Sequence, residues 1–531
     1  MRLTTPGERV RLIVSPNAAQ TSAVFSEAAT TAAPSGNALK LSIQGLLPDT
    51  DYFYGFEVNG VVRTEPVSKG RFHTFPVGKS SFKIAFAGDS HYTTLNQTAF
   101  DEILAAKPML FIHAGDLHYN DTNSTNLDDY RANYDNVLSQ PNEAALFRNL
   151  ASVYTWDDHD FCGNNSDSTF IGRNAARAVY SERVPHYPLP ASAGGTIAQS
   201  LTVGRVRIIV TDLRSAADQE FKVDSPAKTH LGAAQKAWFK QELLDAHNAG
   251  SPLILWVCAN PWIGALNPAQ DSDNWTGFQF ERAEIANFIR VNHISNVVLL
   301  SADMHALAYD DGTHSDYATG GGAPLVVLQA AALTEGGTIK GGPYSVGPLP
   351  GAQQYGMLEV YDNGGPSIAC RFLGMRVGQG VQMSYVFSTS NVVASSARAF
   401  VNISTLARVT SPTDSIVSGF VVSEDGPRTV LMRAVGPTLG QFGLPDALTT
   451  PQITLFKGST VIATNSAWAP TAGEGTLLSA AFDRSGAFRL SDQSSRDAAL
   501  MMTLSPGAYT LQVKSATNAT GAALVEVYDV P

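Results

Sequence analysis

The chain has 531 residues, which is too long for one hydrophobic core, so we expect two to four domains. A hydrophobic content of 44% with 16% charged residues is typical of globular proteins and excludes a largely disordered chain. The net charge of -11, without any run rich in Lys and Arg, argues against a nucleic-acid-binding scaffold, because phosphate backbones are bound by basic surfaces.

The first 77 residues alternate short apolar segments with turn-rich ones and predict a small β domain. Strands are expected at 9–16, 37–46 and 51–60. The stretch from Gly45 to Gly60 resembles the tyrosine-corner strand pair of fibronectin type III-like sandwiches. We therefore expect an N-terminal β-sandwich over residues 1–77.

From Ser81 onward, apolar strand-like runs alternate with helical stretches, which predicts a layered α/β domain. The expected strands are 82–89, 109–116, 205–212, 252–260 and 297–303, and the expected helices are 235–250 and 281–292. Several of these strands end in Asp or Asn. Ligand sites of α/β sheets gather beyond the carboxyl ends of the strands, so these side chains indicate a site.

The end of the chain returns to short β segments. Residues 388–397 are small and polar and predict a linker, and residues 398–531 predict a second β domain. This part resembles a β-rich terminal domain of secreted bacterial proteins. Cell-surface contact, glycan contact and a passive appended sandwich all remain open for it.

Four clusters of metal-ligating residue types stand out along the α/β segment. They are Gly88-Asp89-Ser90-His91, Gly115-Asp116-Leu117-His118-Tyr119, Trp156-Asp157-Asp158-His159-Asp160 and Ser301-Ala302-Asp303-Met304-His305. Each one alone is explained by a capped turn or a solvated pair. Together, in this order and near strand ends, they predict a site for Fe, Zn, Mn or Ca.

The order of the clusters resembles the calcineurin-like metallophosphoesterase signature, and its variants here resemble the PhoD-like alkaline phosphatases and phosphodiesterases. Further matching segments are 212–215, 231–243 and 274–285, and the resemblance covers about residues 1–385. Ser301-Ala302 departs from the usual Ser-Gly. The resemblance implies a multidomain chain with an α/β four-layer metallophosphoesterase sandwich at 81–387. A fibronectin type III-like β-sandwich (1–77) and a C-terminal β-sandwich (398–531) would flank it.

The resemblance also implies a ligand set for two metal ions. Asp116 would bridge both ions. Asp89 and His305 would bind the first ion, with Tyr119 or His91 completing its shell, and this mixed set suits Fe3+ or Zn2+. Asp158 and Asp303 would bind the second ion, and this oxygen-rich set suits Ca2+, Mn2+ or Mg2+. Asn260 stands where the family has a further ligand.

The implied reaction is dimetal-dependent hydrolysis of phosphate esters by a metal-bridging hydroxide, with His159 as general acid. Asp160 or Asp157 would orient its ring, and Asn164 or His159 would help to hold the phosphoryl oxygens. Arg214 is either a phosphate contact or part of a structural ion pair. Strand alternation makes His113 structural, whereas His118 and Cys162 are either next to the site or packed away from it.

The expected substrate is a small phosphate ester. The alternatives are a phospholipase-like diesterase and a secreted binding protein with an inactive site. The longest apolar stretch, 253–259, is far shorter than the roughly 20 residues of a membrane-spanning helix. No signal peptide is visible, so a secreted or periplasmic location rests on the resemblance alone, with the targeting segment expected to have been removed.

Overall fold

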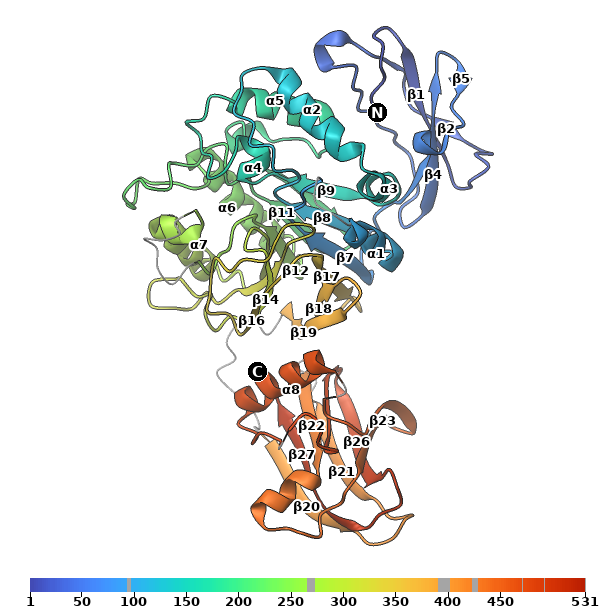
Figure 1. Ribbon diagram of the computed structural model, residues 1–531, viewed down its shortest axis with the longest axis vertical. Coiled ribbons are helices and arrows are strands. Elements are labelled where there is room, and N and C mark those ends of the chain that lie inside the picture. Colours follow the sequence, from blue (N-terminus) through green and yellow to red (C-terminus); the bar gives the residue numbers. More distant parts are fainter. Residues whose placement is uncertain are drawn as a thin grey trace. The chain divides into compact units, whose positions relative to one another are not determined.

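The computed structural model describes residues 1–92, 97–264, 273–389, 402–422, 428–469, 471–490 and 492–530 (Figure 1). These residues form two compact units. The first is Met1–Ile368 with Gly374–Gly380, and the second is Ala369–Leu373 with Val381–Pro531. The predicted linker lies outside the described residues from position 390 onward, and the predicted domain limits stay a prediction.

The N-terminal part of the first unit is an antiparallel sheet in the order β2-β1-β4-β5, with β3 paired to β1 and β6 paired to β4. Its strands are β1 (Arg9–Ser15), β2 (Val24–Phe25), β3 (Ala29–Thr30), β4 (Asp51–Val58), β5 (Val61–Val62) and β6 (Gly70–His73). The Leu47 N–H donates to the Tyr52 hydroxyl at 3.0 Å, just before β4. The fibronectin type III-like assignment stays a prediction.

The strand expected at 37–46 is wrong. Ala38 makes only an isolated bridge to Arg2, and the Leu39 N–H donates to the Met1 carbonyl oxygen. Ala38 is the only residue of this segment that is buried, so its alternating side chains do not contribute a core face to the sheet. This segment pairs locally with the first residues of the chain and does not join the sheet as a strand.

Two further sheets form the centre of the first unit. In one, the order is β17-β7-β8-β9, with β7, β8 and β9 parallel and β17 antiparallel to β7. Its strands are β7 (Phe82–Ala87), β8 (Leu110–Ala114), β9 (Ser152–Thr155) and β17 (Gln354–Tyr361). β17 packs against β14 and β15 of the other sheet, so the two sheets share an interior.

The other central sheet has the order β10-β11-β12-β13-β15-β14-β16, with β11, β12, β13 and β15 parallel. Its strands are β10 (Gln199–Val203), β11 (Val206–Val210), β12 (Leu253–Val257), β13 (Val297–Ser301), β14 (Ala306–Asp310), β15 (Val326–Ala330) and β16 (Val346–Pro350). The five strands expected in the α/β segment are all present. They are almost wholly buried, which explains their continuous apolar sequences.

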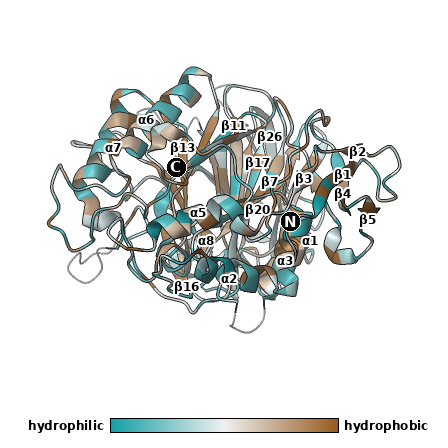
Figure 2. Cartoon of the chain, turned by 90° about the horizontal axis from the view of Figure 1, so that it is seen from above, coloured by the Kyte–Doolittle hydropathy of each residue, from teal (hydrophilic) through white to brown (hydrophobic). Residues whose placement is uncertain are grey.

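Helices flank these sheets (Figure 1). They are α1 (Thr98–Ala106), α2 (Leu127–Leu138), α3 (Pro141–Asn149), α4 (Asp158–Phe161), α5 (Arg173–Arg183), α6 (Ala233–Asn248) and α7 (Gln279–Val291). Phe239 of α6 and Ile285 of α7 pack in one core cluster with Trp256 of β12. Figure 2 draws α2 and α5 largely in teal, in keeping with their polar outer faces. The result is the layered, multi-sheet α/β fold that the sequence predicts.

The chain continues through β18 (Ala369–Arg376) and β19 (Gly380–Ser388), and the division between the units passes through these strands. The second unit contains two antiparallel sheets, β20-β27-β22-β25 and β21-β26-β23-β24. Its elements are β20 (Asn402–Val409), β21 (Ile416–Val422), β22 (Arg428–Val435), β23 (Pro451–Lys457), β24 (Thr460–Asn465), α8 (Ala472–Ser485), β25 (Ala498–Leu504), β26 (Gly507–Ser515) and β27 (Gly521–Asp529). Met432, Leu455 and Val525 belong to one core cluster, so the two sheets pack face to face.

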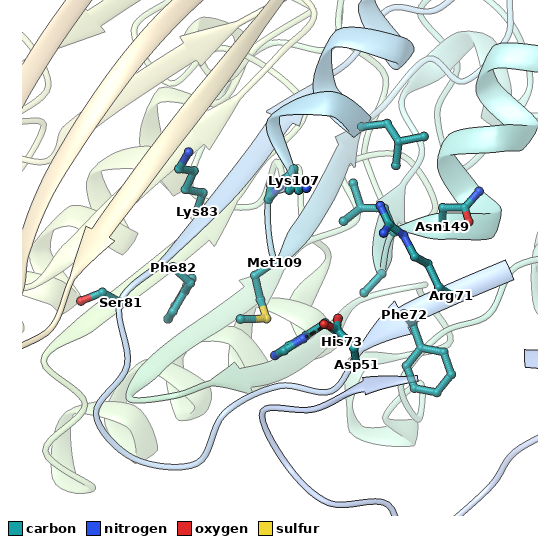
Figure 3. Close-up of a pocket in the computed structure, with 14 residues that line it drawn as sticks. Asp51, Arg71, Phe72, His73, Ser81, Phe82, Lys83, Lys107, Met109 and Asn149 are labelled. Carbon is teal, nitrogen blue, oxygen red and sulfur yellow. Dashed lines mark hydrogen bonds and ion pairs between the residues drawn. The ribbon is translucent and has the colours of Figure 1, made fainter. Parts of the chain in front are cut away.

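A cavity of about 460 Å³ lies in the first unit, where the N-terminal sheet meets the start of β7 (Figure 3). Its lining includes Arg71 and His73 from β6, Phe82 from β7, and Lys107 and Met109 before β8. It therefore lies at the amino ends of the strands, whereas the four clusters follow their carboxyl ends. Among the described residues, no helix is long and apolar enough to cross a membrane.

One buried acid should make the stability of the first unit depend on pH. Glu143 of α3 is 0% exposed, and neither carboxylate oxygen has a hydrogen-bond partner among the described residues. Burial raises the pKa of Glu143 well above its usual value. The folded protein therefore holds this proton more tightly than the unfolded chain does, and the free energy of unfolding falls as pH rises above the unfolded pKa.

We expect Glu143→Gln to remove this penalty. Its stability advantage over the wild type should grow by up to about 1.4 kcal/mol per pH unit above pH 4.5, until the folded-state pKa is reached. Denaturant unfolding of both proteins at pH 5 and pH 8 measures the difference. A difference that is the same at both pH values would contradict the prediction.

Candidate metal centre

The four clusters converge at the edge where the strands of the two central sheets have their carboxyl ends. At Gly88, an added Cβ would lie 2.7 Å from the Ala302 Cβ, so the loops after β7 and β13 are in close contact. At Gly115 (φ 108°), it would lie 2.7 Å from the Asp157 Cβ, which places the loops after β8 and β9 equally close. Glycine allows both approaches because it has no side chain.

Several candidate ligands have left-handed backbone conformations. The φ angles are 65° at Asp89, 55° at Asp116, 62° at Asp303 and 52° at His305. Such conformations cost about 1–3 kcal/mol each in a residue other than glycine, and they cluster at functional sites where the surroundings enforce them. Here each one occurs at the first sharp turn after a strand.

The first half of the centre is a network of Asp89, His305 and Tyr119. The His305 Nε2 lies 2.9 Å from the Asp89 Oδ1, and the Tyr119 hydroxyl lies 3.2 Å from that oxygen and 3.1 Å from that nitrogen. The His305 Nδ1 lies 2.7 Å from the Gly336 carbonyl oxygen, to which it donates, so Nε2 is the nitrogen that faces the centre. A carboxylate, an imidazole and a phenol therefore lie within hydrogen-bond distance of one another.

Charge pairing in this half shifts two pKa values. Burial lowers the pKa of His305, but the Asp89 carboxylate raises it more, to about 9. Burial raises the pKa of Asp89, and the charge and hydrogen bond of His305 lower it more. His91 lies beside this network, with its ring 5.5 Å from that of Tyr119 and its Nδ1 2.8 Å from the Glu335 Oε1.

The second half gathers oxygen atoms. Asp116, Asp158 and His159 offer ligand atoms that all lie within 4.8 Å of one another. Burial raises the pKa of Asp116 well above its usual value, and the nearby carboxylates, Asp158 first among them, raise it further. A group of buried carboxylates that repel one another is stabilised by a bound cation.

Asn260 and Asp303 complete this half with oxygen acceptors. Within the described part of the chain, the Asn260 Oδ1 and the Asp303 Oδ2 are buried and have no hydrogen-bond partner. The Asn260 amide donates to the Asp157 Oδ2 at 2.9 Å, which holds the amide oxygen in place. Buried acceptors are normally satisfied, so these two oxygens fit the oxygen ligands of a hard cation.

Lys340 also lies here, and no sequence signal pointed to it. Its ammonium group forms an ion pair with the Asp303 Oδ1. Burial lowers the pKa of Lys340, but the Asp303 and Asp158 carboxylates raise it more, to well above its usual value. Lys340 is therefore a permanent positive charge at the edge of the oxygen-rich half.

Arg214 forms the buried ion pairs that were one of its two predicted roles. Its side chain is 2% exposed, and its guanidinium pairs with Asp157 through Nε and with both oxygens of Asp273 through Nη1 and Nη2. Three of the five N–H donors of the guanidinium are therefore directed at carboxylates. Asp273 was not identified from the sequence.

The partner of the His159 ring differs from the prediction. The His159 Nδ1 lies 2.6 Å from the Asp121 Oδ1. The predicted partner Asp160 instead accepts hydrogen bonds from the Leu117 N–H, the Asp157 N–H and the Tyr154 hydroxyl. The other predicted partner, Asp157, instead accepts hydrogen bonds from Arg214 and Asn260. Asp121 follows Asp116 by only five positions, and this closeness in the sequence could have identified it as the partner of His159.

Asn164 and Cys162 follow directly after α4, and the phosphoryl contact of Asn164 stays a prediction. Asn164 is exposed, and it is the next residue, Asn165, that donates its N–H to the Asp158 Oδ2 at 2.6 Å. The Cys162 sulfur is buried 3.4 Å from the Tyr130 hydroxyl, within an aromatic core cluster. Cys162 is thus a packing residue.

Two further histidines singled out from the sequence, His113 and His118, are buried. The His113 Nε2 lies 3.0 Å from the Ser90 hydroxyl oxygen, in line with a structural role. His118 is 1% exposed and packs edge-to-face against Tyr134 of α2. Burial lowers the pKa of His113 to about 4 and that of His118 to about 3, so both rings are neutral at pH 7.

Residues 84–341 match the family model described as PhoD-like phosphatase. This segment, slightly less than half of the chain, is therefore similar to PhoD-like phosphatases. Every ligand, charge and ring described above lies within it, from Asp89 to Lys340.

Alkaline phosphatase D of Bacillus subtilis (strain 168) is 25% identical to this chain over 328 residues. The match covers 53% of this chain and 55% of that relative, so the chain spans about half the length of the curated relative. A solved structure of PhoD, with 19% identity and a TM-score of 0.57, covers 73% of this chain and 83% of its own, and it shows the fold. A purple acid phosphatase from yellow lupin (Lupinus luteus) seeds has 13% identity and a TM-score of 0.49, covering 72% of this chain and 69% of its own.

The placement of Asp116 and His113 in the PhoD-like segment leads to opposite expectations for two variants. Asp116→Ala removes a carboxylate from the middle of the ligand cluster, so we expect metal content and activity to fall to background. His113→Ala should cost about 2–5 kcal/mol of stability through a buried cavity but should keep its metal. Elemental analysis of both purified variants tests this, and equal metal loss would contradict it.

Proposed function

We propose that the PhoD-like segment hydrolyses phosphate esters with two metal ions. The observation that supports this proposal best is the group of buried carboxylates around Asp116, which needs a cation, inside a segment that is similar to PhoD-like phosphatases. When bound, two ions would supply Lewis acidity for the phosphoryl oxygens and a nucleophilic hydroxide at neutral pH.

The two halves of the centre would hold different ions. Asp89, His305 and Tyr119, with His91 beside them, offer carboxylate, imidazole and phenol groups, which suit Fe3+ or Zn2+. Asp158, Asp303 and Asn260 offer oxygen atoms, which suit Ca2+, Mn2+ or Mg2+. Asp116 would serve both halves.

His159 is the proposed proton donor to the leaving group. Its side chain is 18% exposed, so a substrate can reach the ring, and Asp121 fixes the ring orientation through Nδ1. The ring also packs against Tyr119, with centroids 4.2 Å apart. A positioned imidazole that touches both the oxygen-rich half and solvent has the placement that a general acid needs.

The substrate, location and accessory roles are also proposals. We propose a small phosphate ester as substrate and a secreted or periplasmic location. Residues 398–531, after a linker at 388–397, would form an accessory β-sandwich that contacts the cell surface or glycan. Residues 1–77 would form the fibronectin type III-like sandwich.

The proposed function predicts metal-dependent activity. We expect purified protein to carry about two metal ions per chain, to lose phosphatase activity when treated with a chelator, and to regain activity when metal returns. Elemental analysis, with assays on a monoester, a diester and a triester, measures this. A protein that hydrolyses none of these esters while fully loaded with metal would contradict it and would favour a binding protein.

The proposed role of His159 predicts a leaving-group effect. In His159→Asn, metal content should stay the same, while turnover of alkyl esters falls about 10²–10⁴-fold, the range typical of lost proton donation. Nitrophenyl esters should lose little, because nitrophenolate leaves without a proton. Asp121→Asn, which keeps the ring but weakens its orientation, should give a smaller loss with the same trend. An equal loss for all leaving groups in His159→Asn would exclude the acid role.

A further inference from the structure

The segment after β15 runs back across the candidate metal centre. Gly336 accepts a hydrogen bond from His305, and Glu335 bonds to His91, so its first part contacts the first half of the centre. The Thr338 hydroxyl donates to the Met304 carbonyl oxygen at 3.1 Å, which brings the segment alongside the loop that carries Asp303. Lys340 follows two residues later.

Lys340 combines a fixed position with access to solvent. Its ammonium group pairs with Asp303, whose side chain is 2% exposed, whereas 35% of the Lys340 side chain is exposed. An ammonium group has three N–H donors, and the Asp303 Oδ1 needs only one of them. The other two have no hydrogen-bond partner among the described residues and can bind a ligand beside Asp303.

Arg214 cannot serve a phosphate in the same way. Its side chain is 2% exposed, and its guanidinium is already paired with Asp157 and Asp273. A substrate could recruit it only by breaking a buried ion pair, which would leave an uncompensated buried carboxylate. Of these two cations beside the oxygen-rich half, Lys340 is the accessible one.

We propose that Lys340 binds a non-bridging oxygen of the substrate phosphate and thereby favours phosphate monoesters over diesters. This proposal rests on the proposed hydrolysis at the same centre. At pH 7 a monoester carries a charge of about -1.5 to -2 and three terminal oxygens, whereas a diester carries a single charge and two such oxygens. An ammonium donor beside the metal ligands therefore contributes more to binding the monoester than the diester.

Lys340→Met tests the proposal, because methionine keeps an unbranched apolar stem and removes the charge. Calorimetric titration of metal-loaded protein with inorganic phosphate should show an affinity about 10- to 100-fold weaker than the wild type, the range expected when a hydrogen bond to a charged group is lost. Lys340→Arg retains the charge and should recover part of that affinity. Metal content and the melting temperature of each variant are measured alongside.

Lys240→Met is the matched control, because Lys240 pairs with Glu284 between α6 and α7, outside the centre. It should bind phosphate as the wild type does. In assays, the ratio of monoester to diester kcat/KM should fall in Lys340→Met, by less than the loss of phosphate affinity because the diester also loses a contact, and should stay constant in Lys240→Met.

Unchanged phosphate affinity in Lys340→Met would overturn the proposal, even if activity fell, because Lys340 would then act only through Asp303. A constant monoester-to-diester ratio would also overturn it. Failure of the wild type to hydrolyse any ester would count against the proposed function instead. The phosphate titration would still decide whether Lys340 binds the anion.

Discussion

The arrangement of the PhoD-like segment depends on electrostatic repulsion among buried carboxylates. Asp89, Asp116, Asp158 and Asp303 are each at most 4% exposed, and they meet where the two central sheets end. Carboxylates brought this close out of water repel one another unless they are protonated or paired with cations. The sheets, the left-handed turns and the close glycine contacts hold together side chains that would otherwise separate.

The protein supplies some of the neutralising charge itself. Arg214 is directed at Asp157 and Asp273, His305 at Asp89, and Lys340 at Asp303. These cations differ in accessibility, which separates their roles. A fully buried guanidinium keeps carboxylates in position, whereas a partly exposed ammonium also faces arriving anions. Exposure, more than charge, therefore decides which cation can recognise a substrate.

The sequence predicted the elements that carry the site, because continuous apolar runs such as 253–257 can only be buried strands or helix cores and their polar ends mark one sheet edge. It could not sort the acidic residues of the third cluster. Asp157 and Asp160 form a reciprocal capping box at the start of α4, and Asp157 also pairs with Arg214 and Asn260, so only Asp158 and His159 remain for the centre. Such a division depends on the turn conformation and not on residue type. Lys340 and Glu335 come from a glycine-rich segment without periodicity, so no sequence signal placed them near the site.

The two halves of the centre should therefore respond differently to a cation. In the first half, Asp89, His305 and Tyr119 already satisfy one another through shared protons, so a metal ion must displace protons before it can bind. In the second half, the Asn260 and Asp303 oxygens are held by their neighbours and have unused lone pairs among the described residues. A hard cation can bind there without breaking an existing hydrogen bond of these atoms. The candidate ligands of the two halves thus differ in their bonding: those of the first half share protons with one another, whereas two oxygens of the second half have no hydrogen-bond partner among the described residues.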